Sequence, residues 1–115
     1  MKIVCACLNS KFIHSSLSPW CLRAGIKAFS SDECEVKVVE ATINSDIDQF
    51  VFRILSESPD VIAFSCYIWN ISLTLEVCKK LKNNLPECEI ALGGPEVSYR
   101  AEDVILQNSF IDYVL

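Results

Sequence analysis

The chain has 115 residues, the usual size of a single domain. It carries 15 acidic and 10 basic residues, a net charge of −5, which argues against a nucleic-acid partner. The hydrophobic content of 51% and the mean hydropathy of +0.32 are high. The apolar blocks are nevertheless far shorter than the roughly 20 residues that cross a bilayer. The composition therefore excludes a membrane span and indicates an α/β domain with buried strands.

The amino terminus and the cysteines indicate a reducing, cytoplasmic location. Lys2 leads directly into a strand-like run, without the apolar segment and cleavage site of a signal peptide. The seven cysteines form no CxxC pair, and there is one histidine, so neither a zinc nor an iron–sulfur site is predicted in this chain. We expect buried free thiols, which pack as small hydrophobic side chains.

Five apolar runs have the length and composition of strands. The run at 61–66 is uninterrupted, as in the centre of a parallel sheet, whereas the run at 34–41 alternates apolar with polar residues and is predicted at an edge. The expected strands are residues 2–8, 34–41, 61–66, 88–92 and 111–115.

Apolar residues at helical spacing fill the segments between these strands. Ser45 is predicted to open the second helix and Asn70 to cap the third, because both residue types favour helix starts. Val104 and Ile105 are expected to be the core residues of the weaker fourth helix. The expected helices occupy residues from about 18 to 28, 45–55, 70–85 and 98–107.

The order of elements is βαβαβαβαβ, which predicts a parallel sheet with right-handed crossovers and helices on both faces. Five strands and four helices best fit a flavodoxin-like (Rossmann-like) α/β three-layer sandwich with strand order 2-1-3-4-5. Residues 1–115 then form one domain. Because the sequence stops on an apolar strand, we expect the natural chain to continue.

In such sheets a ligand lies beyond the carboxyl ends of the strands, where strands one and three separate. Three loops reach this place: 9–18 is rich in hydroxyls and holds the only histidine, 65–70 contains aromatic residues, and 93–99 begins with paired glycines. Glycines let a backbone approach a ligand closely. This broad, largely uncharged rim suits a large flat ligand with a nucleotide tail.

The segments LNSKFIHSSLSPW, FSCYIWN and LGGPEVSY resemble the signature loops of the cobalamin-binding domain in a family of radical-SAM proteins. The group includes the anaerobic magnesium-protoporphyrin ester cyclase type, and the resemblance covers essentially all of the chain. It implies a cobalamin-binding module, with the dimethylbenzimidazole tail buried beside the first and third strands and the corrin ring across the strand ends.

The resemblance also implies a downstream radical-SAM barrel in the same polypeptide, which would bind a [4Fe-4S] cluster and S-adenosylmethionine. The parent would be a methyltransferase or oxidoreductase, and no turnover is expected from the module alone. The cofactor contacts implied by similarity are Asn9, Ser10, His14, Ser15, Ser16, Ser65, Tyr67, Trp69, Asn70, Gly93, Gly94, Pro95, Glu96 and Ser98.

His14 is the candidate lower axial ligand of cobalt. Cobalamin-dependent methionine synthases and mutases carry DxHxxG in this loop, but here Phe12 replaces the aspartate and Leu17 replaces the glycine. The aspartate normally orients the imidazole. Whether His14 ligates cobalt, lies near the corrin or is a surface residue therefore stays open.

Other candidates also have two readings. Ser65 is implied to bond the buried tail, or its hydroxyl satisfies a backbone group at the strand end. Gly93 and Gly94 are expected to leave room for the nucleotide, or they form an ordinary turn. Glu96 and Ser98 would contact the tail, or they suit a helix start.

Two other functions fit the predicted fold. Ser15, Ser16 and Ser18 could hold the phosphate of FMN in a flavodoxin-like module, although the loop lacks glycine. Alternatively, the domain binds no cofactor and only docks a catalytic partner. A phosphoacceptor receiver domain is excluded, since the required aspartates are absent after the first and third strands.

Overall fold

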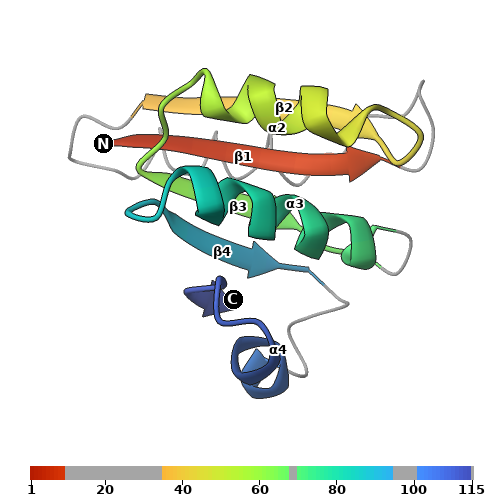
Figure 1. The fold of residues 1–115 in the computed structure, drawn as a ribbon, viewed down its shortest axis with the longest axis vertical. Coiled ribbons are helices and arrows are strands. Elements are labelled where there is room, and N and C mark those ends of the chain that lie inside the picture. The colour runs from red at the N-terminus through yellow and green to blue at the C-terminus, as the bar shows by residue number, and fades with distance from the viewer. Residues whose placement is uncertain (10–34, 68–69, 95–100, 115) are drawn as a thin grey trace.

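The computed structural model describes residues 1–9, 35–67, 70–94 and 101–114 (Figure 1). Its strands form one five-stranded sheet in the order β2-β1-β3-β4-β5, and every neighbouring pair is parallel. The predicted flavodoxin-like strand order and the edge position of the second strand are therefore confirmed. The strands are β1 Lys2–Asn9, β2 Glu35–Thr42, β3 Val61–Ser65, β4 Glu89–Gly93 and β5 Tyr113–Val114.

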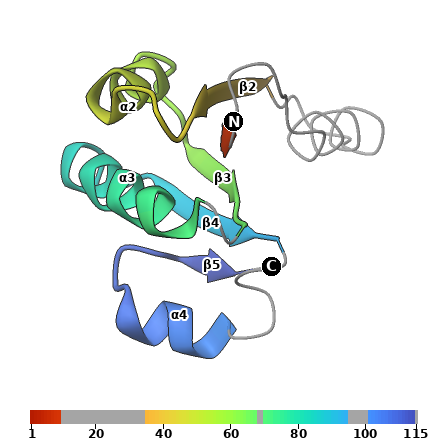
Figure 2. The same cartoon turned by 90° about the vertical axis from the view of Figure 1, so that its right-hand side faces the viewer.

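Two helices cover one face of this sheet, as Figure 2 shows from the side. They are α2 (Ile47–Leu55) and α3 (Ile71–Asn84), while the shorter α4 (Ala101–Gln107) lies next to β5. The helix predicted at about 18 to 28 falls outside the described residues. In the described part of the chain, no helix is both long and apolar enough to cross a bilayer.

The core lies between the sheet and these two helices. Because strand side chains alternate between faces, every second residue of β1, β3 and β4 points toward α2 and α3. The helices contribute Phe50 and Ile54 from α2, and Val77 and Leu81 from α3, all buried. Burial of such side chains stabilises the fold by roughly 1.5–3 kcal/mol each. The bulky strand residues of this core are Val4, Leu8, Ile62, Phe64, Ile90 and Leu92.

The start of α2 lies one residue later than predicted. Asp46, not Ser45, is the N-cap, and its Oδ1 accepts a hydrogen bond from Asp48 N at 2.9 Å. The hydroxyl of Ser45 instead accepts from Thr42 N at 3.1 Å and closes the turn after β2. Both residue types can cap a helix, and the turn uses one of them.

The carboxyl-terminal part differs from expectation at two points. Val104 is buried, but Ile105 is 39% exposed, so the prediction that both are core residues of α4 was wrong for Ile105. The expected strand 111–115 is reduced to the two residues of β5. Ile111, just before it, is buried and packs in the core.

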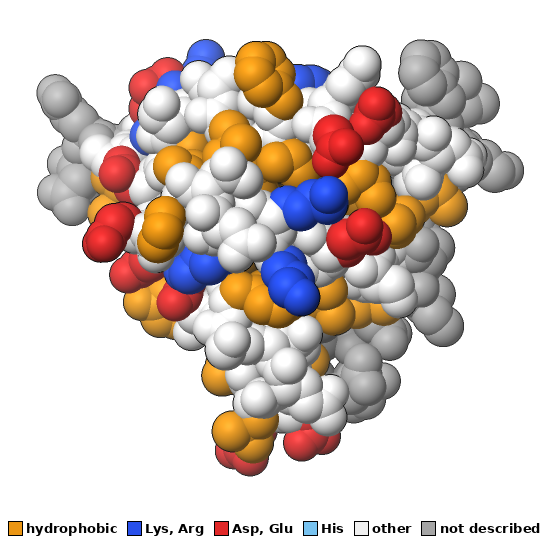
Figure 3. Space-filling model, viewed as in Figure 1, with side chains coloured by type: hydrophobic (Ala, Val, Ile, Leu, Met, Phe, Trp, Pro, Cys, Tyr) orange, Lys and Arg blue, Asp and Glu red, His pale blue; other side chains and the backbone are white. Residues whose placement is uncertain are grey.

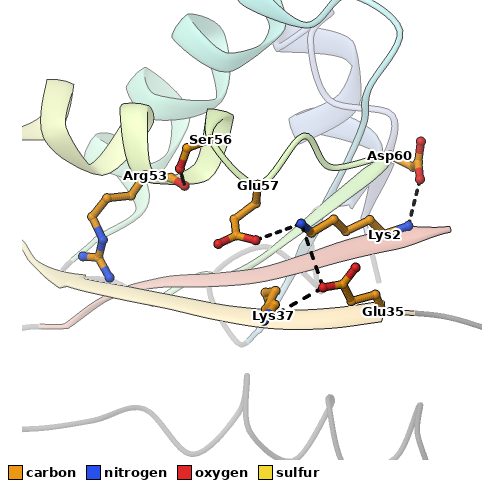
Figure 4. A network of polar contacts seen from close by, with 7 residues as sticks. All are labelled: Lys2, Glu35, Lys37, Arg53, Ser56, Glu57 and Asp60. Atoms are coloured by element: carbon orange, nitrogen blue, oxygen red, sulfur yellow. Dashed lines mark hydrogen bonds and ion pairs between the residues drawn. The ribbon is translucent and has the colours of Figure 1, made fainter.

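Charged side chains at the amino ends of the strands pair with each other (Figure 4). Lys2 Nζ lies 2.9 Å from Glu57 Oε2, and this hydrogen bond is the main cause that raises the pKa of Lys2. Lys2 Nζ and Lys37 Nζ both approach Glu35, at 4.0 and 3.9 Å. Such surface pairs contribute little stability. This edge is the opposite one from the predicted ligand site.

On the face formed by α2 and α3, acidic and basic side chains are interspersed (Figure 3). Lys80 Nζ on α3 pairs with Asp48 on α2 at 3.2 Å. Lys82 Nζ lies 2.7 Å from Asp112 Oδ2, and the same oxygen accepts from Ile90 N at 2.8 Å. Lys80 and Lys82 therefore link α3 to α2 and to the segment before β5.

Asp112 gives a pH-dependent contribution to stability. Partial burial alone would raise the pKa of Asp112, but the hydrogen bonds from Lys82 and Ile90 N hold the pKa below its usual 3.8. A lowered pKa stabilises the fold above the unfolded value and loses this effect as pH falls through the folded value. We expect Asp112→Asn to lower the free energy of unfolding by about 1 kcal/mol at pH 7. In urea titrations the difference from wild type should shrink below about pH 4; a constant difference would contradict this.

Replacement of Thr74 on α3 by valine is expected to stabilise the fold. Its side chain is fully buried, and among the described residues its Oγ1 has no hydrogen-bond partner. A buried hydroxyl without a partner keeps its desolvation cost. Thr74→Val has nearly the same shape and should raise the free energy of unfolding by about 1 kcal/mol, as measured by urea denaturation. A loss of stability would mean that the hydroxyl is bonded in solution.

Candidate functional site

The sheet opens between β1 and β3 at its carboxyl edge. Pairing of β1 with β3 extends to Ala6 and Phe64, whereas β1 stays paired with β2 as far as Asn9. On the other side, β3 stays paired with β4 to its last residue, and Cys66 N continues the ladder by donating to Gly93 O at 2.7 Å. The opening therefore lies at the switch point of the strand order, where ligands of this fold bind.

Asn70 fills the inner end of this opening. Its side chain is fully buried, and Nδ2 donates to Leu8 O at 2.9 Å and to Ser65 O at 3.2 Å. Oδ1 accepts from Tyr67 N at 2.8 Å. Asn70 occupies the N-cap position of α3 as predicted, but its side chain makes no capping hydrogen bond to the helix. The predicted N-cap position is therefore confirmed, while the side-chain amide bonds to β1 and β3 and not to the helix.

The sheet face opposite α2 and α3 carries small side chains along the three central strands. The pairing places Cys5 beside Ala63 and Ala63 beside Ala91, and one step further it pairs Ser65 with Gly93. This contrasts with the bulky residues on the other face. We call this surface the small-residue face; its members are Cys5, Cys7, Ala63, Ser65, Ala91 and Gly93.

Exposure on the small-residue face differs between strands. Cys5 and Cys7 on β1 are 1% exposed, while Ala63 and Ser65 on β3 and Gly93 at the end of β4 are partly exposed. Burial raises the pKa of the Cys5 thiol to about 11, so it stays neutral and inert at physiological pH. The five described cysteines are all free and buried, in agreement with the expectation for them.

Ser65 has a hydroxyl that is available for a ligand. The hydroxyl has no hydrogen-bond partner among the described residues, whereas the carbonyl accepts from Asn70 Nδ2 and from Cys7 Sγ. The alternative that this hydroxyl satisfies a backbone group is therefore not seen in the described structure. A half-buried hydroxyl at the edge of the opening is suited to donate to or accept from a bound molecule.

Gly94 is required by the fold itself. Its φ of +112° is rarely adopted by other residues, and a Cβ built on it would lie 2.4 Å from Cys66 O. The paired glycines were expected to leave room for a ligand; for Gly94 the group that needs the room is the chain's own backbone. A larger residue here would disturb the β3–β4 end whether or not a ligand binds.

Two further expected contacts lie at the same edge. Asn9 ends β1, is 9% exposed, and its carbonyl accepts from Ile43 N at 2.8 Å. Tyr67 follows β3 and is partly buried. The structure thus gathers Asn9, Ser65, Tyr67, Asn70, Gly93 and Gly94 at one edge. The remaining predicted contacts lie outside the described residues: Ser10, His14, Ser15, Ser16, Trp69, Pro95, Glu96 and Ser98.

A polar pocket of about 280 Å³ adjoins Asn9 on the α2 side, between the carboxyl end of β2 and the start of α2. Thr42, Ser45 and Gln49 contribute neutral polar groups to its lining. These residues follow the second strand, whereas the sequence pattern points to the loops after the first, third and fourth strands. Within the described ranges, no group of three or more His, Cys, Asp or Glu could hold a metal ion.

Comparison with known proteins gives three partial sequence matches. The chain is 33% identical over 57 residues (50% of its length) to 2-(S-pantetheinyl)-carbapenam-3-carboxylate methyltransferase of Streptantibioticus cattleyicolor. It is 35% identical over 54 residues (47%) to the cobalamin-dependent radical SAM methyltransferase TokK of Streptomyces tokunonensis, and 29% identical over 72 residues (62%) to hopanoid C-3 methylase of Methylococcus capsulatus. The matched residues make up only 8%, 8% and 14% of those proteins.

A crystal structure of a cobalamin-binding protein from Desulfitobacterium hafniense DCB-2 has the same fold. The TM-score is 0.66 at 17% identity, over 99% of this chain and 52% of that one. The family model for the B12 binding domain matches residues 4–115, nearly the whole sequence. With the switch-point opening and the small-residue face beside it, this match establishes that the chain belongs to the B12-binding domain family.

Proposed function

We propose that this chain is a cobalamin-binding module whose site is the opening between β1 and β3 together with the small-residue face. The observation that carries the proposal is the contrast between the two faces of the sheet. Val4, Ile62 and Ile90 belong to the core on the helix-covered face, whereas the next residue along each strand, Cys5, Ala63 or Ala91, carries a small side chain on the other face. Small side chains project little from a sheet, which would let a flat heteroaromatic tail approach the strands closely.

The described residues fit such a tail in size and polarity. A branched side chain at position 63 or 93 would stand between the tail and the strands, and the chain has Ala63 and Gly93 there. Ser65 supplies a hydroxyl at the partly exposed end, and Asn9 and Tyr67 lie at the same edge of the sheet. When bound, cobalamin would supply a cobalt centre that carries a methyl group or exchanges electrons. The protein residues bind and orient the tail and exclude water from the inner end of the opening.

For the wider protein, we propose a radical-SAM barrel downstream in the same polypeptide, with a [4Fe-4S] cluster and S-adenosylmethionine. The similarity to proteins named as methyltransferases supports methyl transfer as the class of reaction. The signature segments FSCYIWN and LGGPEVSY support placement in the group that includes the anaerobic magnesium-protoporphyrin ester cyclase type. The five buried free thiols support a reducing, cytoplasmic location.

Titration of the purified chain with hydroxocobalamin and, separately, with FMN tests the proposal. We expect hydroxocobalamin to bind, with a change in its visible spectrum, and FMN to leave the protein and flavin signals unchanged. Binding of FMN alone would favour a flavodoxin-like module. Binding of neither by the folded chain would favour a docking domain.

A bulky residue on the small-residue face should block the tail. Ser65→Leu places a branched side chain at the open end of this face, and we expect cobalamin affinity to fall by at least about tenfold, or about 1.4 kcal/mol. The matched control is Val61→Leu, which adds volume to the same strand and the same face at its amino end. The control should retain wild-type affinity. Equal affinities of the two variants in the spectral titration would place the tail elsewhere.

We also propose His14 as the lower axial ligand of cobalt, from its place in the first loop. His14→Ala should then shift the visible spectrum of the bound corrinoid, because the ligand field of the metal changes when an imidazole is lost. Circular dichroism of the variant serves as the control for folding. An unchanged spectrum at full occupancy would assign His14 to the loop surface.

A further inference from the structure

Asn70 supplies hydrogen bonds to backbone carbonyls at the opening between β1 and β3. Where the β1–β3 ladder stops, the carbonyls of Leu8 and Ser65 lose their strand partners, yet both are held by one side-chain amide. The two hydrogens of Nδ2 thus bridge strands that are 57 residues apart in sequence, from Leu8 to Ser65. The bridge fixes how far the two strand ends separate.

We infer that Asn70 is a positioning residue, which sets the width of the opening for the nucleotide tail without touching the cofactor. The amide is fully buried, both donor hydrogens are engaged by carbonyls, and Oδ1 accepts from Tyr67 N. No donor remains for a ligand. This differs from the expectation that Asn70 contacts the cofactor, and it rests on the proposed function.

Three parts of the site depend on this one side chain. It holds the carboxyl end of β1 through Leu8, the end of β3 through Ser65, and the following loop through Tyr67 N. Because Asn70 also begins α3, whose Thr74 N donates to Asn70 O at 2.8 Å, the bridge is anchored on a rigid helix. A change of its donors should therefore alter the shape of the opening more than the rest of the domain.

The test compares cobalamin with cobinamide, a corrinoid that lacks the nucleotide tail. Asn70→Asp keeps the shape and the acceptor for Tyr67 N but faces a carboxylate toward two carbonyl oxygens. We expect cobalamin affinity to fall by at least about tenfold, while cobinamide affinity changes less than about twofold. Asn70→Ala, which removes the bridge without adding charge, should change the ratio of the two affinities in the same direction and keeps the test possible if the aspartate variant fails to fold.

Thr74→Val is the matched control, since Thr74 is equally buried one turn further along α3. It should leave the ratio of the two affinities at the wild-type value. If the Asn70 variants lower both affinities equally, or only lower the melting temperature, Asn70 is merely structural and the inference is wrong. If the wild-type chain binds neither corrinoid, the proposed function fails and the inference fails with it.

Discussion

The whole structure depends on a sheet whose two faces have different tasks. One face must bury bulky side chains against α2 and α3, because the hydrophobic core supplies most of the stability of a domain of this size. The other face carries small side chains at the centre of these strands and toward the carboxyl ends of β3 and β4, among them Cys5, Ala63 and Ala91. Parallel strands pair side by side in register, so small residues on neighbouring strands form a continuous surface. Stability and space for a ligand are thus assigned to opposite faces of the same three strands.

The fold could be predicted from the sequence because its signals are local and repeated. The alternation in 34–41 placed β2 at the edge, and the continuous run 61–66 placed β3 in the centre, as the sheet order confirms. The errors lie where two residues compete for one role. Ser45 and Asp46 can both cap α2, and Val104 and Ile105 can both join the core. Only the three-dimensional structure decides that Asp46 caps the helix and that Val104 is buried.

The sequence predicts a position for the candidate site but not the backbone contacts that its residues make. The loops were found because the carboxyl edge at the switch point follows from strand order alone. The roles of Asn70 and Gly94 could not be found in this way. The partners of Asn70 are 62 and 5 residues away, and the atom that forbids a Cβ on Gly94 belongs to Cys66. The sequence predicts Asn70 as a helix cap and a ligand contact, and Gly94 as a ligand contact or a turn, because an asparagine or a glycine in a loop gives no sign of a distant backbone partner.

The same comparison separates two kinds of residue at the edge of the sheet. Asn70 donates hydrogen bonds to the chain's own backbone, and Gly94 packs so closely against it that no Cβ fits. Replacement of either residue therefore disturbs the protein before any ligand is added. Ser65 has a hydroxyl without a partner among the described residues, so its replacement by a small residue costs the fold little. A parallel sheet that opens must satisfy the carbonyls it exposes, and a buried amide does so without adding charge. The residues that keep the opening in shape therefore differ from those that can recognise what enters it.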